Sequence, residues 1–168
     1  MQNADIRIVH PLAIFEMRDL TPTINDRHRI APGHPVAAPK TIDTDDPALA
    51  QAGPVPHLPE TGKVVSFGPK TGAVTEIASG ASLLVDVEFG RGRRLYVLSQ
   101  GQFPEGGQPA QSALPNTGAL LSVNEDGTFA VIVDGLNRPT SLELIGDTAY
   151  VVTPGGEIWR IDGVSSGD

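Results

Sequence analysis

Residues 118–161, GALLSVNEDGTFAVIVDGLNRPTSLELIGDTAYVVTPGGEIWRI, decide the fold of this chain. They hold short apolar stretches at residues 118–123, 128–133, 141–145 and 148–152, followed by a new glycine-led stretch from Gly156. Asn, Asp and Gly separate these stretches at residues 124–127 and 146–147, and these residue types dominate turns. Apolar residues that recur with period two are typical of strands. The stretch therefore predicts four antiparallel strands joined by short turns.

The same unit occurs more than once along the chain. GKVVSF (residues 62–67), GALLSV (118–123) and GEIWRI (156–161) align without gaps, with apolar residues at the fourth and sixth positions. Strands predicted at residues 73–77, 84–89 and 95–99 follow the first segment as their counterparts follow the second. This aligns Tyr96 with Tyr150 and Gly80 with Gly135. The first copy is longer than the second because of a Gly-, Pro- and Gln-rich insertion at residues 100–117.

A repeated unit of four short strands in about 40 residues is typical of a β-propeller blade. We therefore predict an all-β protein with propeller-type four-stranded repeats over residues 61–168. These residues hold a little over two units, too few to close a ring, so we expect open blade edges and self-association through them. A β-sandwich ranks second, because its short strands need not repeat as a four-strand unit.

The first sixty residues differ in character from the rest. They contain nine of the 15 prolines and only two of the 19 glycines. Proline has no backbone N–H to donate to a strand ladder and restricts the residue before it. We predict an irregular Pro-rich segment over residues 1–60, with a short strand at 6–9, a helical turn at 13–20 and a linker or lid at 31–60.

Composition excludes several classes of function. The net charge of −8 argues against a nucleic-acid partner, since phosphate binding requires clustered Lys and Arg. The chain has no cysteine, which excludes disulfides, thiolate metal sites and a cysteine nucleophile. No apolar run approaches the roughly 20 residues that span a bilayer. The N-terminus has no continuous apolar core, so we predict neither a membrane span nor a signal peptide.

The stretches GKVVSFGPKTGAVTEIASG, LVDVEFGRGRRLYVLSQG and the segment from Gly118 to Ile161 resemble the ScyD/ScyE family of secreted bacterial β-propellers. The resemblance covers residues 61–162 and corresponds to the C-terminal blades of such a protein, without the N-terminal blades of a full member. It implies an extracellular or periplasmic location. It implies no catalytic residues.

The strongest candidate site lies in the connections between successive strand pairs, which can line the mouth of a propeller channel. Asp86, Asn137 and Arg138 lie in or beside these connections and can converge on a ligand there. Gluconolactonase-like propellers hold a divalent metal with such oxygens, although Asp and Asn also bond local backbone groups. Phe103 is the single aromatic residue of the long insertion and a candidate loop contact.

We expect two other groups of polar residues, the four histidines and residues 124–127, to have no ligand-binding role. All four histidines precede the repeats, at positions 10, 28, 34 and 57, and their spacing fits no metal-ligand pattern, so we expect them to be solvated. Residues 124–127, Asn-Glu-Asp-Gly, carry oxygen ligands but lack the distal glutamate of a calcium loop. We expect a β-turn at these residues.

These observations lead to three alternative hypotheses for the function. The first is a non-catalytic module that binds a protein or small molecule through its loops, without a resident cofactor. The second is a metal-dependent lactonase-like or lyase-like enzyme with a divalent cation near Asp86 and Asn137. The third is a truncated product with little independent function.

Overall fold

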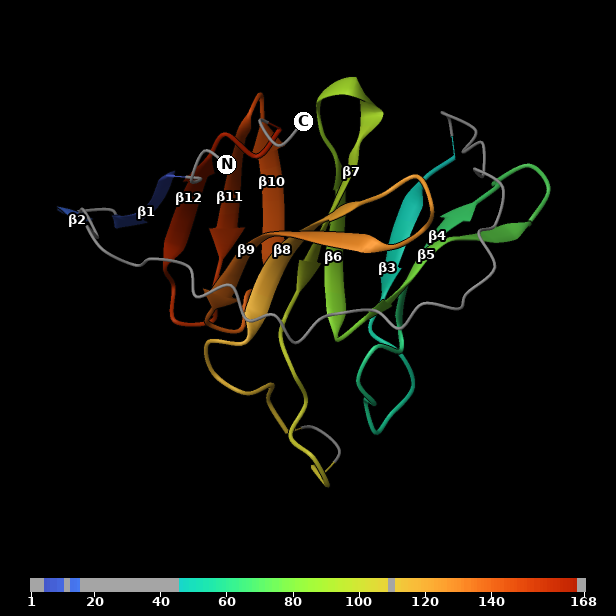
Figure 1. Ribbon diagram of the computed structural model, residues 1–168, viewed down its shortest axis with the longest axis horizontal. Helices are drawn as coiled ribbons and strands as arrows, with labels where there is room; N and C mark the ends of the chain where they lie inside the picture. The colour runs from blue at the N-terminus through green and yellow to red at the C-terminus, as the bar shows by residue number, and fades with distance from the viewer. Residues whose placement is uncertain (1–4, 11–12, 16–45, 109–110, 166–168) are drawn as a thin grey trace.

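The computed structural model describes residues 5–10, 13–15, 46–108 and 111–165 (Figure 1). These residues form three antiparallel sheets and no α-helix. The first sheet contains β3 (Ala48–Gln51), β4 (Gly62–Phe67) and β5 (Val74–Ala81). The middle sheet contains β6 (Leu84–Phe89), β7 (Leu95–Ser99), β8 (Gly118–Val123) and β9 (Phe129–Leu136), with a short 3₁₀ turn, η1 (Arg91–Arg93), between β6 and β7. The third sheet contains β10 (Ser141–Ile145), β11 (Thr148–Val152), β12 (Ile158–Asp162), β1 (Asp5–His10) and β2 (Ala13–Phe15), in that order across the sheet.

The predicted strands are confirmed over most of the repeat region. The strands at 62–67, 84–89, 95–99, 118–123, 141–145 and 148–152 have the predicted bounds. The strands predicted at 73–77 and 128–133 are longer, at Val74–Ala81 and Phe129–Leu136, and the last strand begins at Ile158 rather than Gly156. The grouping of strands differs from their order in the sequence repeat. β7 pairs with β8 across the insertion, with Tyr96 opposite Ser122, so the hairpin of β6 and β7 belongs to the sheet that follows it. The glycine-led strands β8 and β12 are therefore the third strands of their sheets, not the first, and β4 is the second of the three strands in its sheet.

The sequence repeat is also visible in the backbone. β4 and β5 are out of register beside Gly62, and β8 and β9 are out of register beside Gly118. A glycine with positive φ lies in the extra stretch of each pair: Gly80 at φ 104° and Gly135 at φ 77°. Such β-bulges increase local twist and favour glycine. The alignment of Gly80 with Gly135 thus reflects a shared bulge.

The N-terminal segment contributes strands to two of the sheets. β1 pairs with β12, with Ile8 opposite Trp159, which confirms the predicted strand at 6–9. The predicted helical turn is wrong at residues 13–15, which form β2, and residues 16–20 lie outside the described part. β3, which pairs with β4, lies inside the segment predicted to be a linker or lid. Pro47 directly before β3 is compatible with this position, because an edge strand needs a ladder on one side only.

The middle sheet is buried on both faces at its strand β7. All five residues of β7 are buried, and they alternate between two apolar cores. Leu95 and Val97 belong to the core shared with the first sheet, whereas Tyr96 and Leu98 belong to the core shared with the third sheet. Burying a large apolar side chain contributes about 1.5–3 kcal/mol, so these two cores hold the three sheets together.

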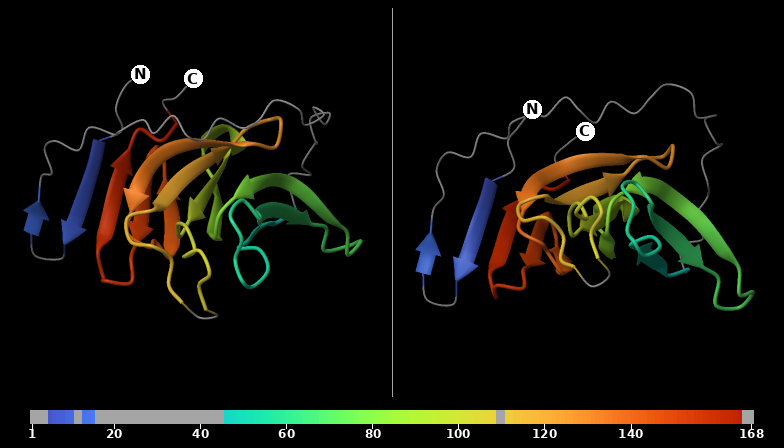
Figure 2. Two further views of the ribbon diagram at one scale, coloured as in Figure 1. Left: turned by 60° about the horizontal axis from the view of Figure 1, so that its bottom comes forward. Right: turned by 90° about the horizontal axis from the view of Figure 1, so that it is seen from below.

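The sheets follow one another around an arc, with β3, β6 and β10 on its inner side and β5, β9 and β2 on its outer side (Figure 2). β6 contacts both β3 and β10. The faces of the first and third sheets that point away from the middle sheet form the two ends of this arc. We call them the outer faces of these two sheets. This arrangement places the strand connections in two groups, one at each end of the strands.

Candidate functional site

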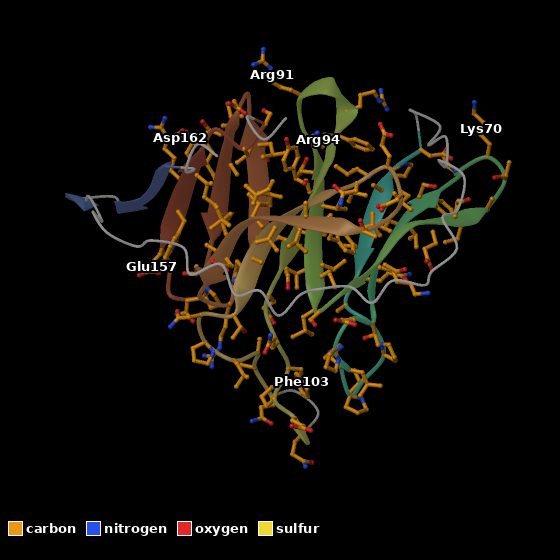
Figure 3. All side chains as sticks on the ribbon, in the orientation of Figure 1. Lys70, Arg91, Arg94, Phe103, Glu157 and Asp162 are labelled. Carbon is orange, nitrogen blue, oxygen red and sulfur yellow. The ribbon has the colours of Figure 1, made fainter. Side chains whose placement is uncertain are left out.

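Two long connections lie at the same end of the molecule and contact each other. Residues 52–61 join β3 to β4, and residues 100–117 join β7 to β8, so both precede a glycine-led strand. Figure 3 shows Phe103 in this group of loops, opposite the end that carries Arg91. The rings of Phe103 and His57 meet edge to face, with centroids 5.5 Å apart and planes at 76°. We call residues 52–61, 100–108 and 111–117 the loop surface.

The two connections end in the same short motif, which the sequence analysis missed. Residues 58–62 read LPETG and residues 114–118 read LPNTG, directly before β4 and β8. The Thr61 hydroxyl donates to the Leu58 carbonyl at 2.8 Å, and the Thr117 hydroxyl donates to the Leu114 carbonyl at the same distance. The repeat therefore extends upstream of each leading glycine, a signal that aligning the preceding residues would have found.

Further backbone contacts fix the base of the insertion. The backbone N–H of Gln102 donates to Thr117 Oγ1 at 2.9 Å, and the N–H of Leu114 donates to the Gln102 carbonyl at 2.8 Å. Arg138 Nε donates to the Ala113 carbonyl at 2.6 Å. These bonds join the two ends of the long loop to each other and to Arg138 in the connection between β9 and β10, and loops held at their base are typical of binding loops on rigid scaffolds.

The side chains of the loop surface are mostly apolar or amide. Val55, Leu58 and Leu114 are 61%, 58% and 40% exposed. Gln102, Gln108 and Gln111 are also exposed. Phe103 itself is half-buried. Apolar side chains are exposed here among hydrogen-bonding amides and two carboxylates, Glu60 and Glu105, which suits a partner that has apolar groups and carries no negative charge.

The expectation of solvated histidines is wrong for His57. Its ring is half-buried in the loop surface, and its Nδ1 atom is buried without a hydrogen-bond partner in the described part of the chain. The ring packs edge to face against Phe103, an arrangement that aromatic rings favour. The side chains of the other three histidines lie outside the described residues.

Asp86 bridges two sheets. Its Oδ1 accepts a hydrogen bond from Val87 N at 2.9 Å, and its Oδ2 accepts one from Leu142 N at 2.8 Å. Leu142 lies in β10, the inner edge strand of the third sheet, so some of its N–H groups face away from the ladder. The carboxylate supplies an acceptor for one of them. Both of its oxygens are therefore engaged by backbone.

The structure does not bring the three predicted channel residues into mutual contact within its described part. Asn137 is exposed, and Arg138 is directed to the insertion through Ala113. Asp86 instead lies near other carboxylates. The pKa of Glu88 is raised by burial, then by the negative charges of Glu143 and Asp86. No group of three or more His, Asp or Glu side chains in the described ranges is arranged to hold a metal ion.

The turn at residues 124–127 is confirmed. Gly127 N donates to the Asn124 carbonyl at 3.0 Å, which closes a β-turn between β8 and β9. Asp126 Oδ1 accepts hydrogen bonds from Thr128 Oγ1 at 2.6 Å and from Thr128 N at 3.0 Å. These bonds lower the pKa of Asp126, because they favour its charged form.

Within the described ranges, no helix has both the length and the apolar character needed to cross a bilayer. No family model, curated protein or solved structure matches this chain.

Proposed function

We propose that this chain is a propeller-type, non-catalytic binding module whose loop surface holds a partly apolar partner that carries no negative charge. The propeller assignment is supported by four features: consecutive antiparallel sheets, a bulge repeated between β4 and β5 and between β8 and β9, two sheet-to-sheet cores and an arc with one strand of each sheet on its inner side. It agrees with the resemblance to the ScyD/ScyE family, from which an extracellular or periplasmic location is also proposed.

The contact between His57 and Phe103 carries the functional part of the proposal. It joins two loops from different sheets into one surface, and the bases of both loops are fixed by threonine hydroxyls. Exposed leucine and valine side chains on that surface gain free energy when a partner removes them from water, at about 25 cal/mol per Å². The exposed glutamines add hydrogen bonds that orient the partner.

The enzymatic alternative is less well supported by the geometry. It requires Asp86 to offer an oxygen to a divalent cation, yet both of its oxygens already accept backbone hydrogen bonds. The hydrogen bonds of Asp86 go to the backbone of Val87 and Leu142 rather than to Asn137, which is exposed. A structural role explains the carboxylate without a ligand.

The proposal is tested by selecting random peptides on the immobilised chain and mapping a selected peptide by NMR chemical shifts. We expect the chemical-shift changes on binding to be concentrated in the loop surface. The double variant Leu58→Ser, Phe103→Ser is expected to lose most of the affinity. Val131→Ser, at a 59% exposed position on β9, serves as the control and keeps it.

Two results contradict the proposal. One is a selected peptide that maps to the opposite end of the strands and is unaffected by the double variant. The other is lactone or ester hydrolysis that requires an added divalent metal and disappears in Asp86→Ala, which would establish the enzymatic alternative.

A further inference from the structure

The outer face of the third sheet carries apolar residues whose counterparts on the middle sheet are buried. Tyr96, Leu98 and Leu120 of the middle sheet are at most 1% exposed, because they pack against the third sheet. Their counterparts in the repeat are Tyr150, Val152 and Ile158. Val152 and Ile158 are 37% and 40% exposed. The third sheet thus presents the same kind of face that the middle sheet buries, and no sheet formed by the described residues covers it.

The outer face of the first sheet is the complementary case. Val97 and Leu121 of the middle sheet lie in the core shared with the first sheet. From the strand registers, their counterparts are Leu49 and Val65, which are directly opposite each other on β3 and β4. Val65 is buried, whereas Leu49 is 48% exposed. On the same sheet, Val74 opposite Phe67 is 62% exposed.

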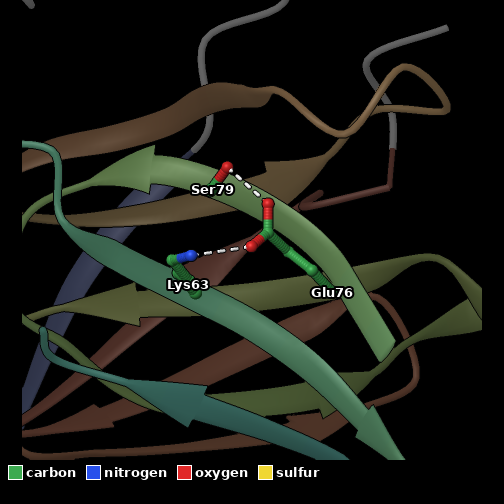
Figure 4. A network of polar contacts seen from close by, with 3 residues as sticks. All are labelled: Lys63, Glu76 and Ser79. Atoms are coloured by element: carbon green, nitrogen blue, oxygen red, sulfur yellow. Dashed lines mark hydrogen bonds and ion pairs between the residues drawn. The ribbon is translucent and has the colours of Figure 1, made fainter. Parts of the chain in front are cut away.

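Each face carries an ion pair, and the exposed Glu143, opposite Tyr150 on the third sheet, lies outside these pairs. On the first sheet, Lys63 Nζ lies 2.8 Å from Glu76 Oε2, and Ser79 donates to the other Glu76 oxygen at 3.0 Å (Figure 4). On the third sheet, Arg160 lies 2.9 Å from Asp162. These pairs reduce the electrostatic cost of bringing the two faces together.

We propose that the outer face of the third sheet docks on the outer face of the first sheet of a second copy of this chain, and vice versa. The chain already forms this interface twice, between its first and middle sheets and between its middle and third sheets. A contact that repeats the same rotation is head-to-tail and closes into a ring when the rotation allows it. Two copies supply six sheets, within the usual four to eight of a propeller, whereas three copies supply nine.

The proposal rests on the propeller arrangement proposed above, but not on the loop surface. Its first test is the mass of the full 168-residue chain by light scattering and sedimentation over a range of concentrations. We expect a dimer of twice 17.6 kDa that does not grow further as concentration rises. A cooperatively folded monomer at tens of micromolar overturns the proposal, and so does open-ended growth. Loss of peptide binding in a dimeric chain would contradict only the proposed function.

The second test introduces like or complementary charges at two apolar positions of the interface. Leu120 and Val151, which correspond to Ile158 and Leu49, lie in one core cluster, so Ile158 is expected to face Leu49 of the other copy. Leu49→Lys and Ile158→Lys are each expected to give monomers, whereas Leu49→Lys combined with Ile158→Glu restores the dimer. Val131→Lys on the middle sheet is the control and leaves the mass unchanged.

The third test does not depend on the stability of charged variants. The chain has no cysteine, so Leu49→Cys and Ile158→Cys introduce single thiols. A short bis-maleimide is expected to cross-link a mixture of the two variants into a heterodimer, and neither variant with itself. Self-cross-linking of one variant would indicate a face-to-face dimer, and the absence of any cross-link would indicate a different contact. Either result overturns the proposal.

Discussion

Replacing Asp86 by alanine separates a structural carboxylate from a catalytic one. The substitution removes the acceptor of the Leu142 N–H, and Leu142 is only 3% exposed, so water cannot readily replace it. A hydrogen bond to a charged group contributes about 1.5–3 kcal/mol, and a buried donor left unpaired costs about 1–3 kcal/mol. The bond to Val87 N joins neighbouring residues and adds little. Relief of repulsion with Glu88 offsets part of the loss.

We therefore expect Asp86→Ala to lower the free energy of unfolding by about 2 kcal/mol. Asp86→Asn retains one acceptor oxygen and is expected to cost about 1 kcal/mol, since neutral hydrogen bonds contribute less. The measurement is urea unfolding followed by circular dichroism, with the midpoint falling and the slope unchanged. Asp134→Ala, at an exposed aspartate on β9, is the matched control and leaves the midpoint where it is.

Two outcomes refute this reasoning. A loss below about 0.5 kcal/mol in Asp86→Ala, the range of ordinary surface substitutions, would show that the bridge between β6 and β10 adds nothing. An increase in stability in Asp86→Asn would indicate a residue retained for function at the expense of stability, as active-site residues often are.

Three further predictions concern the inner strand and the cores. The folded-state pKa of Glu88 is raised, so the folded protein loses stability as pH rises above the ordinary carboxyl range near 4. Glu88→Gln is therefore expected to be more stable than the unchanged chain at pH 7 and equally stable at pH 3. Unfolding curves at both pH values check this, and an equal effect at both contradicts it. Gly118→Ala would press a Cβ against Pro139 and within 2.8 Å of the Leu136 carbonyl, at a cost of about 1–3 kcal/mol, whereas Gly155→Ala, whose Cβ meets nothing closer than 3.7 Å, is the control. Leu98→Ala empties a fully buried position between the middle and third sheets, and calorimetry is expected to show a loss of about 2–5 kcal/mol; a loss below 1 kcal/mol would contradict the two-sided burial of β7.

The candidate site was only partly predictable. Phe103 lies in the loop surface because a long insertion between two strands must leave the sheet at their ends. The burial of His57 was not predictable, since it depends on two loops that are far apart in sequence and meet only after the sheets pack. The same holds for Asp86, whose main partner is 56 residues away. Ordinary local preferences of aspartate give no sign of that bond.

The sequence by itself determined the turns, the repeat and most of the strands from Gly62 onward. Side-chain alternation and turn residues act over a few positions, so β6, β7, β8, β10 and β11 have the bounds that the pattern predicts. Tertiary structure decided which strands share a sheet. β3 is short and follows a proline, and β1 joins β12 from the opposite end of the chain, so neither pairing has a local signal. Strand pairing is settled by which apolar faces can be buried together, and that depends on all three sheets at once.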